Sequence, residues 1–268
     1  MDIFDFVGSY KNHPVLFVGS GFSLRYLKNS YNWSDLLRTI AIELTGSDEY
    51  YLDLRQSSFD EKKDECNLMQ LASALEEKFN EILKNDRNGK FKEINDKFYE
   101  LSRNHKSVSR FKLYVCDLLN HMNFRNGVND EVDLFREMSK NISSIITTNY
   151  DLLLEELVDF IPLIGNEILL SNPYGTIYKI HGCISDISDI HTPLILTPNQ
   201  YITHRKNRDR LFSRLEELAR EYTFLFVGFS LRDPDIRAIL IELEQLQDGK
   251  PRFYMVGPDI KETEARLW

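Results

Sequence analysis

Cysteine is scarce in this sequence of 268 residues, which contains only Cys66, Cys116 and Cys183. The three lie far apart and none belongs to a CxxC pair, so the sequence supports neither a disulfide framework nor a zinc ribbon. Isolated cysteines of this kind are typical of a reducing compartment. We therefore expect a cytoplasmic protein without structural zinc.

Long apolar runs and dense basic clusters are also missing. No apolar run approaches the ~18 residues of a membrane span, and the N-terminal stretch MDIFDFVGSYKNHP has acidic residues where a signal peptide needs basic ones. The chain has 33 Lys and Arg against 42 Asp and Glu, a net charge of −9, and no basic stretch is dense enough to attract nucleic acid. We expect a soluble, intracellular protein without membrane contact or direct nucleic-acid binding.

Short apolar runs that end in small or polar residues are present at three places. Val15-Leu16-Phe17-Val18 runs into Gly19, Ile145-Ile146 runs into Thr147, and Phe224-Leu225-Phe226-Val227 runs into Gly228. Such runs are typical of parallel strands that helices cover on both faces. Ligands bind at the carboxyl edge of a sheet of this kind.

Strands and helices alternate beyond residue 141. The expected strands cover residues 142–148, 176–180, 194–197, 222–227 and 252–256, and the expected helices cover 151–158, 208–221 and 235–246. This alternation predicts an α/β protein with a Rossmann-like, doubly wound and mainly parallel sheet.

Residues 46–140 differ in character from the rest of the chain. They are rich in Lys, Glu, Asp and Asn, and apolar residues recur at helical spacing, as in Leu68-Leu71-Leu75. We expect a helical insertion here, beside the ligand cleft, in a core made of residues 1–45 and 141–268. Because the chain stops at Trp268 inside an expected helix, a piece of a longer protein is also expected.

The turn Gly19-Ser20-Gly21 suits a nucleotide. Glycines bring the backbone close to a ligand, and free amides at a helix start attract phosphate. The third glycine of the dinucleotide fingerprint is missing and no acidic residue ends a second strand, so a hydride-transfer site is not supported. A purely structural turn is the alternative.

Thr148-Asn149-Tyr150-Asp151 places an amide and a carboxylate at a strand end. Asn149 suits a ligand-facing role, in which it holds a water or a ribose hydroxyl. Asp151 suits the cap of the next helix.

His181 follows the expected strand 176–180, and Gly182 behind it leaves the imidazole room over a ligand. Histidine is the side chain that most readily takes up and releases a proton near neutral pH, which suits a general base. Cys183 is a weak candidate for a nucleophile, because no second histidine is placed by the sequence to activate it.

Gly228 and Ser230 lie in a further strand-to-helix turn and are expected to line an adenosine or ribose pocket. In the alternative account, Asp233 and Pro234 simply start the next helix.

These four segments, in this order, resemble the motifs of the sirtuin superfamily, and more closely those of the sirtuin-like NAD-cleaving domains of bacterial anti-phage defence proteins. Residues 19–23 are similar to the GAGxS loop that embraces the NAD diphosphate, and 148–151 to the QNxD segment. His181-Gly182 is similar to the HG of the catalytic histidine, and 228–231 to the GTSL turn. Residues 194–197 with Tyr201 resemble a segment of the defence-type branch.

The sequence departs from the protein-deacylating members in two ways. It has no cysteine tetrad for zinc, and residues 24–29 read LRYLKN in place of the GIPDFR continuation of the first loop. An acyl-lysine tunnel is therefore not expected. What the resemblance implies is cleavage of the bond between nicotinamide and ribose, with water as acceptor.

The implied protein is an NAD hydrolase that depletes NAD when infection is sensed, with Asn149 and His181 as catalytic residues, NAD as substrate and no metal. The implied cofactor-binding residues are Gly19, Ser20, Gly21, Phe22, Ser23, Thr148, Asp151, Gly228, Ser230 and Leu231. A homo-oligomer, or further domains or a partner that sense phage, is expected. The alternative is a non-catalytic module that senses NAD or ADP-ribose, and a protein deacylase is disfavoured.

Overall fold

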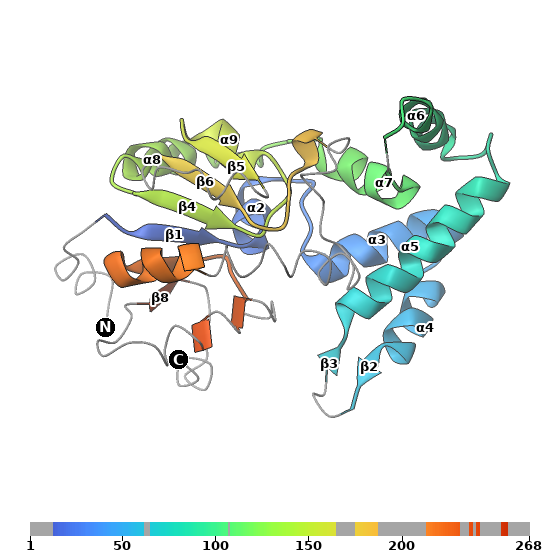
Figure 1. Cartoon of the computed structure of the whole chain (residues 1–268), viewed down its shortest axis with the longest axis horizontal. Helices are drawn as coiled ribbons and strands as arrows, with labels where there is room; N and C mark the ends of the chain where they lie inside the picture. Colours follow the sequence, from blue (N-terminus) through green and yellow to red (C-terminus); the bar gives the residue numbers. More distant parts are fainter. Residues whose placement is uncertain are drawn as a thin grey trace.

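The structure is a computed structural model that describes residues 13–61, 65–106, 108–164, 175–186, 213–230, 236–237, 240–241 and 253–256. Figure 1 shows two groups of elements side by side along the longest axis. One is a sheet with helices on it, and the other is a group of helices beside the sheet.

The sheet has six parallel strands in the order β5-β6-β4-β1-β7-β8. The strands are β1 (Val15–Val18), β4 (Ser144–Thr147), β5 (Ile161–Ile164), β6 (Thr176–Lys179), β7 (Phe224–Val227) and β8 (Phe253–Val256). The prediction of a Rossmann-like parallel sheet is confirmed. β5 was not predicted, and the predicted strand 194–197 lies outside the described residues.

Alternate residues of each strand contribute to opposite faces of the sheet, and both faces are buried. Val15 and Phe17 pack with Leu215 and Leu218 of the helix over residues 213–221. Leu16 and the other residues of the second face pack with α2 (Ser20–Tyr26), α8 (Asn129–Ser139) and α9 (Leu153–Leu157). Figure 1 shows α8 and α9 on one side of the strands and the helix 213–221, in orange, on the other. Two covered faces explain why the central strands β1 and β7 are apolar throughout.

A second group of elements is mainly helical. It consists of α3 (Trp33–Thr45), α4 (Glu49–Ser57), α5 (Leu68–Asn85), α6 (Lys92–Arg103), α7 (Arg110–Leu119) and the hairpin of β2 (Phe59–Asp60) and β3 (Glu65–Cys66). Within the described residues, no helix combines the length and apolar character needed to cross a membrane.

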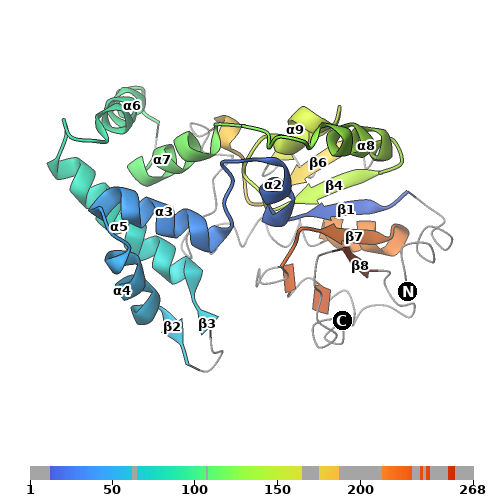
Figure 2. The same cartoon turned by 180° about the vertical axis from the view of Figure 1, so that it is seen from behind.

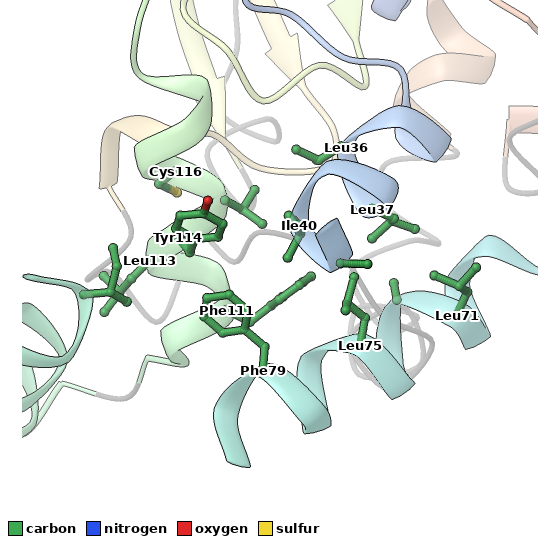
Figure 3. Packing of buried hydrophobic residues seen from close by; sticks show 14 of the residues in the cluster. Leu36, Leu37, Ile40, Leu71, Leu75, Phe79, Phe111, Leu113, Tyr114 and Cys116 are labelled. Atoms are coloured by element: carbon green, nitrogen blue, oxygen red, sulfur yellow. The ribbon is translucent and has the colours of Figure 1, made fainter. Parts of the chain in front are cut away.

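The core of the helical group lies between α3, α5 and α7 (Figure 3). Phe79 of α5 is fully buried, with its ring centroid 5.8 Å from that of Phe111 and 5.2 Å from that of Tyr114. Leu37 and Ile40 of α3 belong to the same cluster, whereas α8 packs on the sheet. The division of the chain at residues 46 and 140 stays a prediction.

The helical group contacts the carboxyl edge of the sheet. Ile184, which follows β6, is a buried member of the helical cluster, and Tyr150, which follows β4, packs against that cluster with its ring 6.4 Å from that of Trp33. The amide of Ile184 donates to the carbonyl of Tyr150 at 3.1 Å. In Figure 2, α2 lies between the sheet and the helical group. The edge where ligands bind in this fold class therefore faces the helices.

Candidate functional site

The carboxyl ends of β1 and β7 meet at the switch point of the sheet. β4 and β6 lie on one side of β1, and the chain then crosses to β7 on the other side. Gly19 and Gly228 directly follow the two strands. The amide of Gly19 donates to the carbonyl of Val227 at 3.1 Å, and that of Gly21 donates to the carbonyl of Gly228 at 2.8 Å. These two amides, expected to face a diphosphate, have partners within the protein.

The three glycines of the switch point have no room for a side chain. A Cβ on Gly19 would lie 2.5 Å from the Gly228 oxygen, and one on Gly21 would lie 2.8 Å from it. Gly228 has φ +61, and its Cβ would lie 2.3 Å from the Phe22 nitrogen. Glycine is required here because two backbones touch. Diphosphate binding by this loop stays a prediction.

Asn149 lies at the end of β4 and is 8% exposed. Its Nδ2 donates to the carbonyl of Gly19 at 3.0 Å and to Ser23 Oγ at 3.1 Å. A carbonyl only accepts hydrogen bonds, so the amide must turn Nδ2 toward Gly19 and leave Oδ1 on its other side. Oδ1 is therefore the acceptor that this side chain can offer a ligand.

Asp151 joins the same loop to two helices. Its Oδ2 accepts from Ser23 Oγ at 2.8 Å, and its Oδ1 accepts from the Leu153 amide at 3.1 Å at the start of α9. Ser23 is itself 2% exposed. The carboxylate therefore fixes α2 and α9 relative to the loop that carries Asn149.

His181 lies in the turn after β6 and is 7% exposed. Gly182 behind it has φ 98, a left-handed conformation that favours glycine. The amide of Ile180 donates to the carbonyl of Thr147 at 3.1 Å, so the turn that carries His181 is bonded to the last residue of β4. Asn149 and His181 therefore follow the ends of neighbouring strands.

A buried ion pair at this edge was not predicted. Lys179, the last residue of β6, has a fully buried side chain, and its Nζ lies 2.7 Å from Glu155 Oε1 of α9. Nζ also donates to the carbonyl of Asp151. Glu155 Oε2 is buried without a hydrogen-bond partner among the described residues. A lysine inside an apolar strand was the available signal, since a buried charge requires a partner.

The other predicted site residues differ in their surroundings. The ring of Phe22 is buried 4.8 Å from that of Tyr26 and 4.9 Å from that of Phe135, so the side chain belongs to the core. Ser20 and Thr148 are partly exposed and Ser230 is exposed. Three predictions lie outside the described residues, namely Leu231, the segment 194–197 and Tyr201.

In the described ranges, no three His, Cys, Asp or Glu side chains gather as metal ligands.

The fold and this edge define a Rossmann-like α/β protein with buried polar side chains at its switch point. Residues 143–268 match the family described as SIR2-like domain, and the resemblance to the sirtuin superfamily is confirmed.

Three curated relatives have the same name, NAD(+) hydrolase ThsA. The chain is 24% identical over 263 residues to that of Enterococcus faecium, which covers 94% of this chain and 45% of the relative. It is 30% identical over 122 residues to that of Cytobacillus dafuensis, and this match covers 42% of this chain and 24% of the relative. It is 29% identical over 160 residues to that of Acinetobacter baumannii (strain 532279), and this match covers 52% of this chain and 32% of the relative. The chain spans less than half the length of these relatives.

Proposed function

We propose that this chain is an NAD hydrolase domain that converts NAD and water to nicotinamide and ADP-ribose. The names of its relatives and the SIR2-like match support this activity. The observation that carries the proposal is the amide of Asn149. Two hydrogen bonds of Nδ2 fix its orientation, and it follows a strand that pairs with the strand before His181.

The reaction breaks the bond between the ribose C1′ and the nicotinamide nitrogen, and the bonding electrons leave with neutral nicotinamide. Positive charge then spreads over the ribose, and water attacks C1′. In the proposed mechanism, Asn149 Oδ1 accepts a hydrogen bond from the attacking water or from a ribose hydroxyl and so orients it. His181 accepts the proton that the water loses and passes it to solvent.

The diphosphate of NAD is assigned to the start of α2. The amides of Gly19 and Gly21 donate within the protein, so the partly exposed Ser20 is the residue best placed to bind an anion there. The positive end of the helix favours such an anion. The ribose and adenine are assigned to the turn of Gly228 and Ser230.

His181→Ala and Asn149→Ala test the assignment. The purified chain is incubated with NAD, and nicotinamide and ADP-ribose are separated by chromatography. We expect each variant to lose turnover by at least about 100-fold, as loss of a general base or of an orienting group does. A His181→Ala protein with wild-type turnover and an unchanged melting temperature would show that the general base is another group.

Asn149→Ala needs a stability control, because its Nδ2 satisfies buried groups. Its loss leaves the Gly19 carbonyl without this donor and lowers the free energy of unfolding by about 1–3 kcal/mol. Turnover is therefore compared well below the melting temperature of each variant. Binding of NAD by the wild type without any product would favour the sensing module over the enzyme.

We further propose that the domain acts in anti-phage defence by depleting NAD, as the resemblance of its motifs implies. Expression in bacteria with intracellular NAD measured before and after phage infection tests this role. NAD that stays constant in infected cells while the wild type is expressed would contradict it.

A further inference from the structure

We propose that Lys179 is a positioning residue of the NAD site. Its ammonium, held by Glu155, fixes the carbonyl of Asp151 and thereby the loop that presents Asn149. The effect of Lys179 on catalysis rests on the proposed NAD hydrolysis. Its effect on the loop rests on its contacts alone.

Lys179 bonds β6 both to α9 and to the loop that precedes α9. Its Nζ forms the 2.7 Å ion pair with Glu155 of α9 and donates to the backbone carbonyl of Asp151, before α9 begins. Its side chain has no exposed surface. Because β6 fixes the lysine backbone, the ammonium is a rigid anchor for the loop between β4 and α9.

The hydrogen-bond network continues from the loop to Asn149, one of the two predicted catalytic residues. Asp151 Oδ2 accepts from Ser23 Oγ, which in turn accepts from Asn149 Nδ2, and Nδ2 also donates to the carbonyl of Gly19. On the other side, Lys179 ends β6, two residues before His181 in the turn that follows. One buried cation therefore connects the two residues assigned to the chemistry.

Stability alone does not explain a charge in this place. Desolvation of two buried ions often cancels their attraction, and apolar side chains of similar size are often as stable or more so. Here one carboxylate oxygen, Glu155 Oε2, also has no hydrogen-bond partner in the described part of the chain. An ammonium has three donor hydrogens in a directed arrangement, which no apolar side chain supplies. The feature particular to Lys179 is thus the direction of its bond to the Asp151 carbonyl.

The double variant Lys179→Met/Glu155→Leu separates the positioning role of Lys179 from its effect on the stability of the fold. Lys179→Met alone leaves the Glu155 carboxylate buried without a cation and is expected to lower the melting temperature, whereas the double variant removes both charges. We expect the double variant to melt within about 4 °C of the wild type. Its kcat for NAD is expected to fall about 100-fold, the cost of a misplacement of about 1 Å, with KM changed much less.

Hydrogen exchange supplies a readout that is independent of turnover. The amides of Asn149 and Leu153 donate to Thr147 Oγ1 and Asp151 Oδ1, so both report on the loop. We expect both to exchange faster in the double variant. The amide of Gly46, which donates to the Ile42 carbonyl in the helical group, is the control and keeps its rate.

Glu155→Gln keeps the shape of the side chain and an acceptor for Lys179, but it leaves the buried ammonium without a counter-charge. We expect a lower melting temperature and, below that temperature, a smaller loss of turnover than in the double variant, because the bond of Lys179 to the Asp151 carbonyl is kept. If the double variant does not fold, Lys179→Met below its own melting temperature carries the same test.

Wild-type turnover in the folded double variant would overturn the inference, and so would lost turnover with unchanged exchange at Asn149 and Leu153. If the wild type itself forms no nicotinamide, the proposed function fails. The exchange rates then still decide whether Lys179 fixes the loop.

Discussion

Gly228 lies where the backbone of another segment comes too close for any side chain. Its φ is +61, and a Cβ would lie 2.3 Å from the Phe22 nitrogen. We expect Gly228→Ala to lower the free energy of unfolding by about 3 kcal/mol, from about 1–2 for the left-handed conformation and the rest for overpacking. Unfolding by urea, followed by circular dichroism, measures the loss.

Gly46→Ala is the control for this change. Gly46 has φ +84 at the end of α3, but nothing lies within 4 Å of a Cβ placed there. The expected cost is the conformational part alone, about 1–2 kcal/mol. Equal losses in the two variants would mean that the backbones shift to admit the methyl group, so that the close approach of α2 to the end of β7 adds no cost.

The sequence indicated some residues of the site better than others. Asn149 and His181 stand out because each follows an apolar strand with a small or polar neighbour. The pairing of Lys179 with Glu155 does not stand out in the sequence, because it depends on how α9 packs beside β6. The glycines at 19 and 228 were predicted for a nearby ligand, whereas in the structure each is required by the other segment's backbone.

Among the elements, buried strands were the most predictable. β1, β4, β7 and β8 contain apolar runs, and the positions of these strands and of β6 agree with the predicted ranges to within two residues. β5 carries Pro162 and exposed residues at the edge of the sheet, so it lacks the apolar pattern of a covered strand. The contact between the helical group and the carboxyl edge of the sheet depends on tertiary packing. The periodicity of apolar residues in the sequence does not encode such packing.

Ile184 anchors the turn of His181 in the helical group. It is 8% exposed within the helical cluster, and its amide donates to Tyr150, the neighbour of Asn149. We expect Ile184→Ala to lower the free energy of unfolding by about 2–4 kcal/mol. NAD turnover of the folded protein should also fall, because both predicted catalytic residues lose a shared support.

Leu71→Ala is the matched control for Ile184→Ala. Leu71 is fully buried in the same cluster but lies on α5 (Figure 3), so its loss costs a similar amount without touching the loops of the site. Turnover is measured below both melting temperatures. If the two variants turn over NAD equally, the helical group does not support the site through Ile184.

At the scale of the whole molecule, α7 makes stability sensitive to alkaline pH. Burial raises the pKa of Tyr114 from its usual 10.0 to about 12, and it also raises the pKa of the Cys116 thiol. A raised pKa means that the folded chain keeps protons that the unfolded chain releases, so this stability is full below the usual pKa and is lost as pH rises. We expect the melting temperature to fall above about pH 9.

Tyr114→Phe isolates one part of this dependence. Phenylalanine has no proton to lose, so the variant should lose less stability than the wild type between pH 9 and the raised pKa of about 12. The buried ammonium of Lys112, whose pKa burial lowers, acts in the opposite direction in both proteins and cancels in the comparison. Melting curves at matched pH values would contradict the expectation if the two proteins lost stability in parallel.

The last prediction concerns association and activity. An NAD hydrolase that is always active would kill its host cell, so we expect the isolated domain to be weakly active and to gain activity when copies or a partner order the site. Large exposed apolar side chains on α8, Leu134 at 69% and Met138 at 43%, are the kind of surface that such contacts cover. Light scattering over a concentration series, with NAD turnover per protomer measured at each point, should show both quantities rise together. Full turnover by a strict monomer at every concentration would rule this regulation out, because no association would remain to order the site.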